Sequence, residues 1–294
     1  MGTTALGSGG DASGRAGARW RLEPGLAWLA PALLMLLLLF VAPIAQMVWA
    51  SFTDPRLGLE NYQHTFGDTL YLKVLRNTIV SAIGATLACL AIGYPTAYAI
   101  YRAAGRWRMI MLTIVLFSYA VGTVPRAFSW LVVLGDRGVV NQLLALVIPR
   151  FDSIPFLYNQ LGVLIGMVHV MLPFMTLMLL GSMLRINPNL EAAARTLGAS
   201  RTRAFLEVFV PLTRPGVIAG AMLIFVYSLG FYVVPAVLGG SSQTTIVMEI
   251  SDLALRNGLW GLAAALSTLV VVISVVGAAV YVRLTGISNV YARE

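Results

Sequence analysis

Residues 163–180 read VLIGMVHVMLPFMTLMLL, and none of these residues is charged. Apolar and polar residues do not alternate in this stretch, whereas a membrane β-strand would show about 10 residues of alternating pattern. Inside a bilayer the backbone amides and carbonyls of a segment must be satisfied by hydrogen bonds within the protein, and a continuous apolar run satisfies them as a helix. The stretch therefore predicts a transmembrane helix.

Runs of the same kind recur along the 294 residues, of which 59% are hydrophobic and only 11% charged. A helix needs about 20 apolar residues to cross a bilayer. Five of six uncharged runs meet that length, and the third continues past Arg126 into Ala127–Gly135. The six runs are Pro24–Thr53, Asn77–Tyr101, Met109–Pro125, Ser153–Leu184, Gly216–Met248 and Asn257–Val282. The sequence predicts an all-α membrane protein with six transmembrane helices.

The basic residues indicate the orientation of these helices. With a cytoplasmic N-terminus, 13 of the 20 Lys and Arg residues fall in inside segments and 7 in outside segments. An excess of basic residues in cytoplasmic loops is the usual arrangement in membrane proteins. We therefore expect both termini inside. Because the net charge of +8 is spread between spans, it reports topology and does not indicate a nucleic-acid partner.

The ends of the chain differ from the spans in composition. Residues 1–23 are rich in Gly, Ala and Ser and predict a disordered cytoplasmic tail. The apolar run that follows is longer than the 7–15 residues of a signal peptide, and no small-residue cleavage site follows it, so we expect a retained span. A transmembrane domain is expected over residues 24–284 and a cytoplasmic tail over 285–294.

Residues typical of catalytic or metal sites are scarce. Cys89 is the only cysteine, and its apolar surroundings favour a small core residue. The two histidines, His64 and His169, share no metal-ligand spacing. The phosphate-binding pattern GxxxxGK[S/T] does not occur, and the only lysine is Lys73, so we expect no nucleotide site in this chain. We predict no catalytic residue, no metal site and no cofactor.

Proline and glycine recur inside the expected spans. Pro125 lies in the third run, and two small-xxx-small pairs occur at Gly162–Gly166 and Gly216–Gly220. Small residues let membrane helices approach closely. We therefore favour close helix packing over a hinge role for these positions. The short apolar run Val139–Ile148 cannot span a bilayer and predicts an interfacial or external helix.

A polar stretch, NLEAAARTLGAS at Asn189–Ser200, interrupts the apolar pattern between the fourth and fifth expected spans. Asn187-Pro188 before it is a good helix start, because Asn caps and Pro suits the first helical position. Glu191 falls in the first turn, where the helix dipole favours a carboxylate. Gly198 is placed to end the helix.

A second helix is expected from Ser200, which can cap it, to Pro211, which would end it. The first helix is too short to be stable by itself in water. It therefore needs a surface to pack on. Packing against its own bundle is one alternative, and docking into another protein is the one that we favour.

The segment 191–216, EAAARTLGASRTRAFLEVFVPLTRPG, resembles the EAA loop of ABC-importer permeases. That loop carries EAA, a Gly seven residues after the Glu, and I-x-L-P about nine residues further on. The matching residues here are Glu191-Ala192-Ala193, Gly198 and Val208-Phe209-Val210-Pro211, with Val in place of both Ile and Leu. Residues 76–102, 126–144 and 227–240 also resemble the spermidine/putrescine branch of these permeases.

The resemblance implies a type I importer permease in the bacterial inner membrane, with the loop 186–214 docked on a cytoplasmic ATPase. It further implies a dimer of ATPase subunits that bind ATP and Mg²⁺, a second homologous permease subunit and an extracytoplasmic solute-binding protein. The residues expected to contact the ATPase are Glu191, Ala192, Ala193, Arg195, Leu197, Gly198 and Ala199.

The transported solute is less well indicated. Polar and aromatic side chains in spans normally face the bundle interior, although many only bond neighbouring helices. The resemblance favours a polyamine, which would use aromatic faces and carboxylates. Arg126 would need a partner such as Asp136, or it could attract an anionic solute instead. An ion-coupled secondary transporter with His169 as proton relay is a further alternative. Candidate residues of the solute path are Asn77, Tyr94, Tyr98, Arg126, Trp130, Asp136, Tyr227 and Tyr232.

Overall fold

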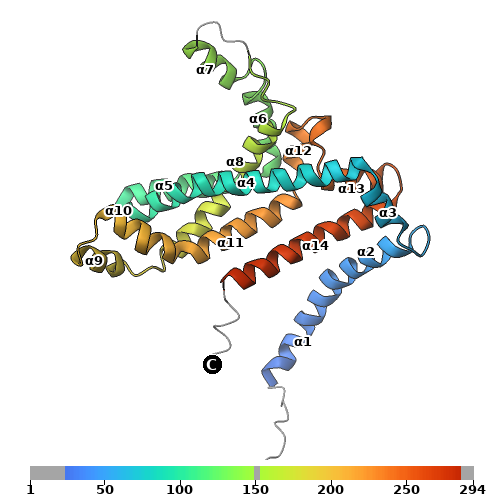
Figure 1. Cartoon of the computed structure of the whole chain (residues 1–294), viewed down its shortest axis with the longest axis horizontal. Coiled ribbons are helices and arrows are strands. Elements are labelled where there is room, and N and C mark those ends of the chain that lie inside the picture. The colour runs from blue at the N-terminus through green and yellow to red at the C-terminus, as the bar shows by residue number, and fades with distance from the viewer. Residues whose placement is uncertain (1–23, 149–152, 286–294) are drawn as a thin grey trace, which may run out of the picture. The chain divides into compact units, whose positions relative to one another are not determined.

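The computed structural model describes residues 24–148 and 153–285, and every regular element in those ranges is helical (Figure 1). The tail expected over 1–23 and nearly all of the tail expected over 285–294 lie outside the described residues. The contacts within the chain divide it into two units, Met1–Gln46 and Met47–Glu294. The expected bounds of the transmembrane domain, 24–284, remain a prediction.

The described part of the first unit is a single apolar helical stretch. It contains α1 (Pro24–Leu36), the π-helical turn η1 (Leu37–Val41) and the first residues of α2 (Ala42–Thr53). Side chains from Pro31 to Gln46 are exposed, and most of them are apolar. Such a surface suits a helix whose solvent is lipid.

The second unit holds the remaining elements. The elements after α2 are α3 (Glu60–Gly67), α4 (Thr69–Arg102), α5 (Gly105–Ala120), α6 (Thr123–Val133), α7 (Val139–Val147), α8 (Gln160–Met183), α9 (Asn189–Thr196), α10 (Arg201–Ala204), the π-helical turn η2 (Phe205–Phe209), α11 (Val210–Leu229), α12 (Val233–Leu238), η3 (Ser241–Gln243), α13 (Ile246–Leu255) and α14 (Trp260–Thr285).

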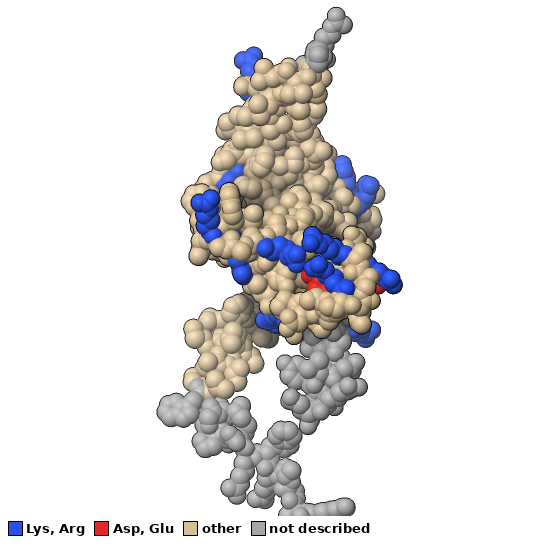
Figure 2. Space-filling model, turned by 90° about the vertical axis from the view of Figure 1, so that its left-hand side faces the viewer, with Lys and Arg blue, Asp and Glu red and all other residues tan. Residues whose placement is uncertain are grey.

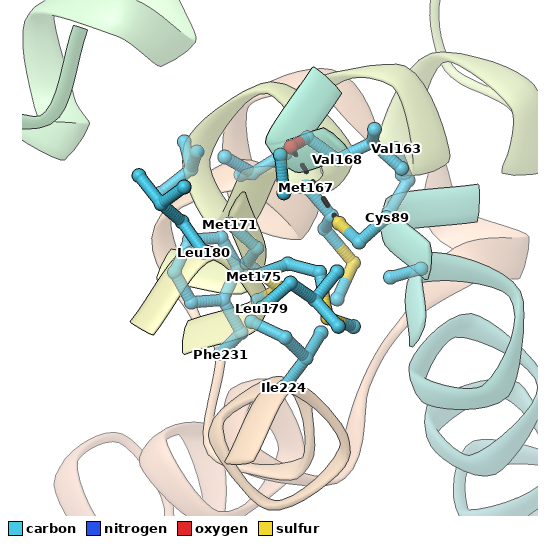
Figure 3. Close-up of a cluster of buried hydrophobic side chains, with 14 of the residues drawn as sticks. Cys89, Val163, Met167, Val168, Met171, Met175, Leu179, Leu180, Ile224 and Phe231 are labelled. Carbon is cyan, nitrogen blue, oxygen red and sulfur yellow. Dashed lines mark hydrogen bonds between the residues drawn. The ribbon is translucent and has the colours of Figure 1, made fainter. Parts of the chain in front are cut away.

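Helix α8 is the centre of this unit, and it contains the uncharged stretch 163–180. It packs on α4 and α11, and also on α5, α6 and α12. Met167, Met171 and Met175 follow one another at every fourth position and are fully buried, together with neighbours from α4 and α11 (Figure 3). Cys89 of α4 lies in the same cluster and donates a hydrogen bond to the Val168 carbonyl, 3.7 Å away. The prediction of a core cysteine is confirmed.

Close packing explains why glycine and methionine face each other in this cluster. A Cβ added to Gly93 of α4 would lie 2.9 Å from Met175, and one added to Gly220 of α11 would lie 2.8 Å from the same side chain. A Cβ on Gly216 would overlap Ser182, and one on Gly166 would come within 2.6 Å of Val234. The expected packing role is confirmed for Gly166, Gly216 and Gly220.

Five helices of the described chain are long and apolar enough to cross a membrane, and a sixth span is counted when α5 and α6 are taken together. This agrees with the six spans expected from the sequence. The helix α7 also forms where the short apolar run predicted it. The five long candidates are Pro31–Thr53, Thr69–Arg102, Gln160–Met183, Arg201–Leu229 and Trp260–Arg283.

The third expected span is not a straight helix, because α5 and α6 meet at an angle of 98°. The break falls at Val121 and Gly122, just before Pro125. Proline has no N–H to donate to the carbonyl four residues earlier, which here belongs to Val121. At this position the packing role expected for proline is therefore replaced by a bend.

The fifth expected span is displaced toward the polar loop. It was expected from Gly216 to Met248, but the long helix runs from Arg201 to Leu229 and is followed by short elements. The prediction that Pro211 ends the preceding helix is wrong. The wide π turn η2 just before it bonds the Val210 N–H to the Phe205 carbonyl, so the backbone absorbs the proline without stopping.

Candidate functional site

The polar loop between α8 and α11 folds as its capping residues predict. The Asn187 side chain accepts a hydrogen bond from the Asn189 N–H at 3.0 Å, and Ser200 Oγ accepts one from the Arg203 N–H at 3.2 Å. Gly198 has a φ of +94°. Its N–H donates to Arg195, and the next N–H, of Ala199, donates to Ala194, each at 3.1 Å. This pair of bonds is a Schellman motif, so Gly198 ends α9 as expected.

Helix α9 contributes nothing to the core of the chain. None of its residues is buried, and Leu197, directly after it, is 89% exposed. Ala192 and Ala193 are exposed as well, while Glu191 is half-buried because it lies against α4. An apolar side chain this exposed beside a flat alanine surface leaves a contact area that the described chain does not cover.

One ion pair connects α9 to the end of α4. A guanidinium nitrogen of Arg102 lies 3.5 Å from a carboxylate oxygen of Glu191. The side chain of Arg102 is 55% exposed and that of Glu191 is 17% exposed. An exposed pair of this kind contributes little free energy, but it orients α9 toward α4.

The face that carries α9 and α10 is basic. Figure 2 shows this face, with Lys and Arg atoms gathered around a small acidic patch. Arg195 and Arg201 belong to the loop itself, and Arg106 and Arg108 lie at the start of α5. Arg203 pairs with Glu207 at 2.9 Å. Positive charge on this face agrees with the cytoplasmic side expected from the arginine distribution.

A groove of about 690 Å³ runs beside the loop. Its walls come from α8, α11 and α14, and the segment that leads into α9 closes one end. Residues that line it include Ser182, Arg185, Asn187, Leu190 and Gly216. The groove adds concave surface next to exposed α9.

The end of α4 meets the loop through aromatic side chains, which the sequence analysis did not connect. Tyr98 and Tyr101 of α4 pack on Phe205 and Phe209 of η2, with ring centroids of the contacting pairs 4.9–5.3 Å apart. The spacing of the tyrosines, three residues apart, and of the phenylalanines, four apart, is a helix-face signal. It could have shown two aromatic faces, but not that they meet.

Two residues expected in the solute path make hydrogen bonds to other segments of the bundle. Tyr94 Oη lies 3.0 Å from Thr213 Oγ1, which joins α4 to α11. The Asn77 side-chain amide donates to the carbonyls of Ser242 at 2.7 Å and Thr244 at 3.4 Å, which holds the turn before α13. Both contacts are of the interhelical kind that polar groups in membranes commonly make.

Arg126 lies at the break between α5 and α6 and is only 6% exposed. Its Nε donates to the Val121 carbonyl at 2.8 Å, and Nη2 donates to the same oxygen and to the Tyr119 carbonyl at 3.1 Å. Nη1 reaches the Val170 carbonyl of α8 at 3.5 Å. The guanidinium therefore replaces the N–H that Pro125 lacks and satisfies the carbonyls freed by the bend.

The expected partner of Arg126, Asp136, is exposed, and none of the ion pairs between described residues joins the two. Trp130, which was also expected in the solute path, is hydrogen-bonded to His169 of α8. Its indole N–H donates to His169 Nδ1 at 2.8 Å, which leaves the proton of a neutral imidazole on Nε2. Arg126 and His169 both line a cavity of about 420 Å³, otherwise mainly apolar.

A row of aromatic side chains runs from α5 across α8 to α11. Tyr119 packs on Phe174 with centroids 5.0 Å apart, Phe174 on Tyr227 at 5.7 Å, and Tyr227 on Phe231 at 5.6 Å. Tyr227 and its neighbour Tyr232 are each 43% exposed. Of the residues expected in the solute path, these two keep the most accessible aromatic surface.

The residues described here hold no group of three or more His, Cys, Asp or Glu side chains that could bind a metal ion. What they present is a bundle of apolar helices with a bent pair, and a capped polar loop on its basic face. Residues 26–285 match a protein family with the description "binding-protein-dependent transport system inner membrane component".

The chain belongs to this family. It is a permease component of an ABC importer in the inner membrane. The permease is 31% identical to the spermidine/putrescine transport system permease protein PotB of Escherichia coli strain K12 over 224 residues, which are 76% of the permease and 81% of PotB. PotB of Haemophilus influenzae is 31% identical over 233 residues, which are 79% and 81% of the two chains.

A solved structure of a bacterial alginate ABC transporter, in complex with an alginate pentasaccharide-bound periplasmic protein, contains a chain similar to the permease. The TM-score is 0.71 at 20% identity, and the match covers 88% of the permease and 94% of that chain. The expected fold of a type I importer permease is confirmed. Family membership sets aside the ion-coupled secondary transporter considered from the sequence.

Proposed function

We propose that the permease is a non-catalytic pore subunit, and that a cytoplasmic ABC ATPase drives it through the loop 186–214. The observation that carries this proposal is Leu197, which is 89% exposed at the end of a helix with no buried residue. Burial of one leucine side chain contributes about 1.5–3 kcal/mol. An α9 that is capped at both ends and still uncovered fits a preformed docking element.

The proposed contact residues share this exposed end of the loop. Arg195 and Leu197 would supply charge and apolar area, and Gly198 would set the direction in which the chain leaves α9. ATP and Mg²⁺ would be bound by a dimer of ATPase subunits. A second homologous permease would complete the pore, and an extracytoplasmic solute-binding protein would deliver the solute. The remaining proposed contact residues are Glu191, Ala192, Ala193 and Ala199.

We further propose that the solute is a polyamine such as spermidine or putrescine. The similarity to PotB supports this substrate class. Exposed aromatic surface at Tyr227 and Tyr232 suits an ammonium group, because the face of an aromatic ring attracts cations. The anionic alternative loses its main support, since the guanidinium of Arg126 already donates to three backbone carbonyls.

Co-purification with the ATPase tests the docking surface. We expect Leu197→Asp to remove the ATPase from the purified permease, because the substitution places a charge where apolar contact is needed. Leu57→Asp is the matched control, since Leu57 is 82% exposed in the turn between α2 and α3. It should leave the ATPase bound. Undiminished co-purification with Leu197→Asp would contradict the proposed docking.

Uptake of radiolabelled spermidine into proteoliposomes that contain the whole importer tests the solute class. We expect uptake that depends on ATP and is competed by unlabelled putrescine. Competition by a small phosphonate or dicarboxylate, with no effect of putrescine, would instead support the anionic alternative.

A further inference from the structure

Helices α11 and α4 are connected to the loop in different ways. Helix α11 continues from α10 and η2 without a break, so the backbone itself carries any movement of the loop into it. Helix α4 is not adjacent to the loop in the sequence, although the last turns of α4 lie against the loop. Its 34 residues give it a length of about 51 Å, which exceeds the roughly 30 Å of the hydrocarbon core.

The connection between α4 and the loop consists mainly of rings. Tyr98 lies 4.9 Å from Phe205 and 5.3 Å from Phe209, and Tyr101 lies 5.3 Å from Phe209, measured between ring centroids. Phe209 is 2% exposed. We call these four residues the aromatic joint. Contacts at these distances are the favourable ones for aromatic pairs, and rings have few rotatable bonds to absorb a displacement.

The backbone beneath the two phenylalanines is unusual. Phe205–Phe209 form a π-helical turn. Such turns are rare, and those that occur are often found at functional sites. In a regular α-helix the residue after Phe209 would bond four residues back, but here the Val210 N–H bonds to Phe205, five residues back. Both rings therefore belong to the short segment that joins α10 to α11.

A second, weaker contact acts at the same place. Arg102 pairs with Glu191 of α9, and its guanidinium lies 6.0 Å from the centroid of the Tyr98 ring. Helix α4 also packs tightly on α8, where a Cβ added to Gly93 would lie 2.9 Å from Met175. A displacement of the end of α4 would thus be passed into the centre of the bundle.

We propose that the aromatic joint makes α4 follow the coupling loop, so that α4 and α11 move together when the ATPase moves α9. This inference rests on the proposed function. It assigns Tyr98, expected from the sequence to line the solute path, a positioning role instead. The joint acts by holding two elements at a constant separation, and not by contact with the solute.

Distance measurements between spin labels test this proposal. One label is placed on Arg201→Cys at the start of α10, and the other on Ile92→Cys, which is exposed on α4, in a Cys89→Ala background. We expect a narrow distance distribution that is unchanged between the nucleotide-free importer and the importer trapped with ATP and vanadate. Tyr98→Leu should broaden this distribution and make it depend on nucleotide.

Three further variants separate the joint from general stability. Tyr98→Phe keeps the ring and should behave as the unsubstituted permease. Phe52→Leu removes one ring of an aromatic pair between α2 and α3, whose centroids lie 5.0 Å apart, a spacing similar to that in the joint. It should leave the distances between the spin labels unchanged. Phe205→Leu, at a half-buried position, removes a ring from the loop side of the joint and should broaden the distance distribution in the same way. It replaces Tyr98→Leu as the test if Tyr98→Leu does not fold. The number of solute molecules transported per ATP should fall only in the two joint variants.

Two results would overturn the proposal. One is a narrow, nucleotide-independent distribution in Tyr98→Leu and Phe205→Leu. The other is equal broadening in Phe52→Leu or Tyr98→Phe. If no ATPase binds the unsubstituted permease, the proposed function fails, but the width of the distribution in the permease alone still tests the joint.

Discussion

Small residues occur in two places in this permease and have opposite surroundings. In the centre of the bundle Gly93 and Gly220 face Met175, and the space that they leave is filled by its side chain. In the loop Ala192 and Ala193 are exposed, and so is Leu197 beside them. The comparison teaches that a small residue marks a close approach, but the neighbour that makes it can lie within the chain or outside it.

The largest effect expected is at the filled site. Met175→Ala should lower the free energy of unfolding by about 2–5 kcal/mol, because it opens a cavity between three helices that packing cannot close. Unfolding of the purified permease by denaturant in detergent measures it. Met178→Ala, on the same helix but 40% exposed, should cost less than about 1 kcal/mol. Equal losses in both variants would contradict the distinction between filled and open surfaces.

The second effect is expected at the uncovered site. Gly198 has a φ of +94°, which costs a residue with a Cβ about 1–2 kcal/mol. Gly198→Ala should therefore weaken ATPase binding about tenfold, since 1.4 kcal/mol corresponds to a factor of ten, and isothermal titration can measure this. Gly258→Ala is the matched control, because Gly258 has a φ of +69° in the turn between α13 and α14 and open space around it. A similar loss of affinity in the control would show that the end of α9 has no special role.

The smallest effect concerns a partly buried carboxyl that belongs to neither site. Burial, followed by the negative charges of Asp252 and Asp68, raises the pKa of Glu249 in α13 above its ordinary value of 4.5. A raised pKa means that the folded state favours the neutral acid, so stability is full below the ordinary pKa and is lost as pH rises through the raised pKa. Tyr71 also lies near this carboxyl.

Glu249→Gln is neutral at every pH and should melt at a higher temperature than the unsubstituted permease at neutral pH. The difference should vanish below about pH 4, where the glutamate is protonated in both states. Melting curves of the detergent-solubilised permease between these pH values measure it. A difference that does not change with pH would show that charge is not its cause.

Capping and hydrophobicity are local properties, and the features that depend on them were predictable. The uncharged runs indicated helices of spanning length because backbone groups in lipid have no other way to be satisfied. Asn187, Ser200 and Gly198 act as expected, since each bonds or bends the backbone only within a few residues of itself.

Features that depend on distant partners could not be predicted in the same way. At the bend between α5 and α6, Arg126 satisfies carbonyls that the bend frees and also donates to the Val170 carbonyl of α8, so this arrangement needs α8 in place. Pro211 was expected to end a helix by the local rule, but the helix continues through a π turn whose two phenylalanines pack on tyrosines of α4. Neither outcome is encoded in the order of neighbouring residues alone.

By itself, the sequence determined the class of the protein, the number of spans, and the short polar helix that ends at Gly198. Only the tertiary structure decided which small residues are packed against a neighbour and which are exposed, and that Tyr98 meets Phe205 and Phe209. The physical reason is the separation along the chain over which each interaction acts. Hydration and capping act on each segment separately, whereas packing selects partners that can lie more than one hundred residues apart, as Tyr98 and Phe205 do.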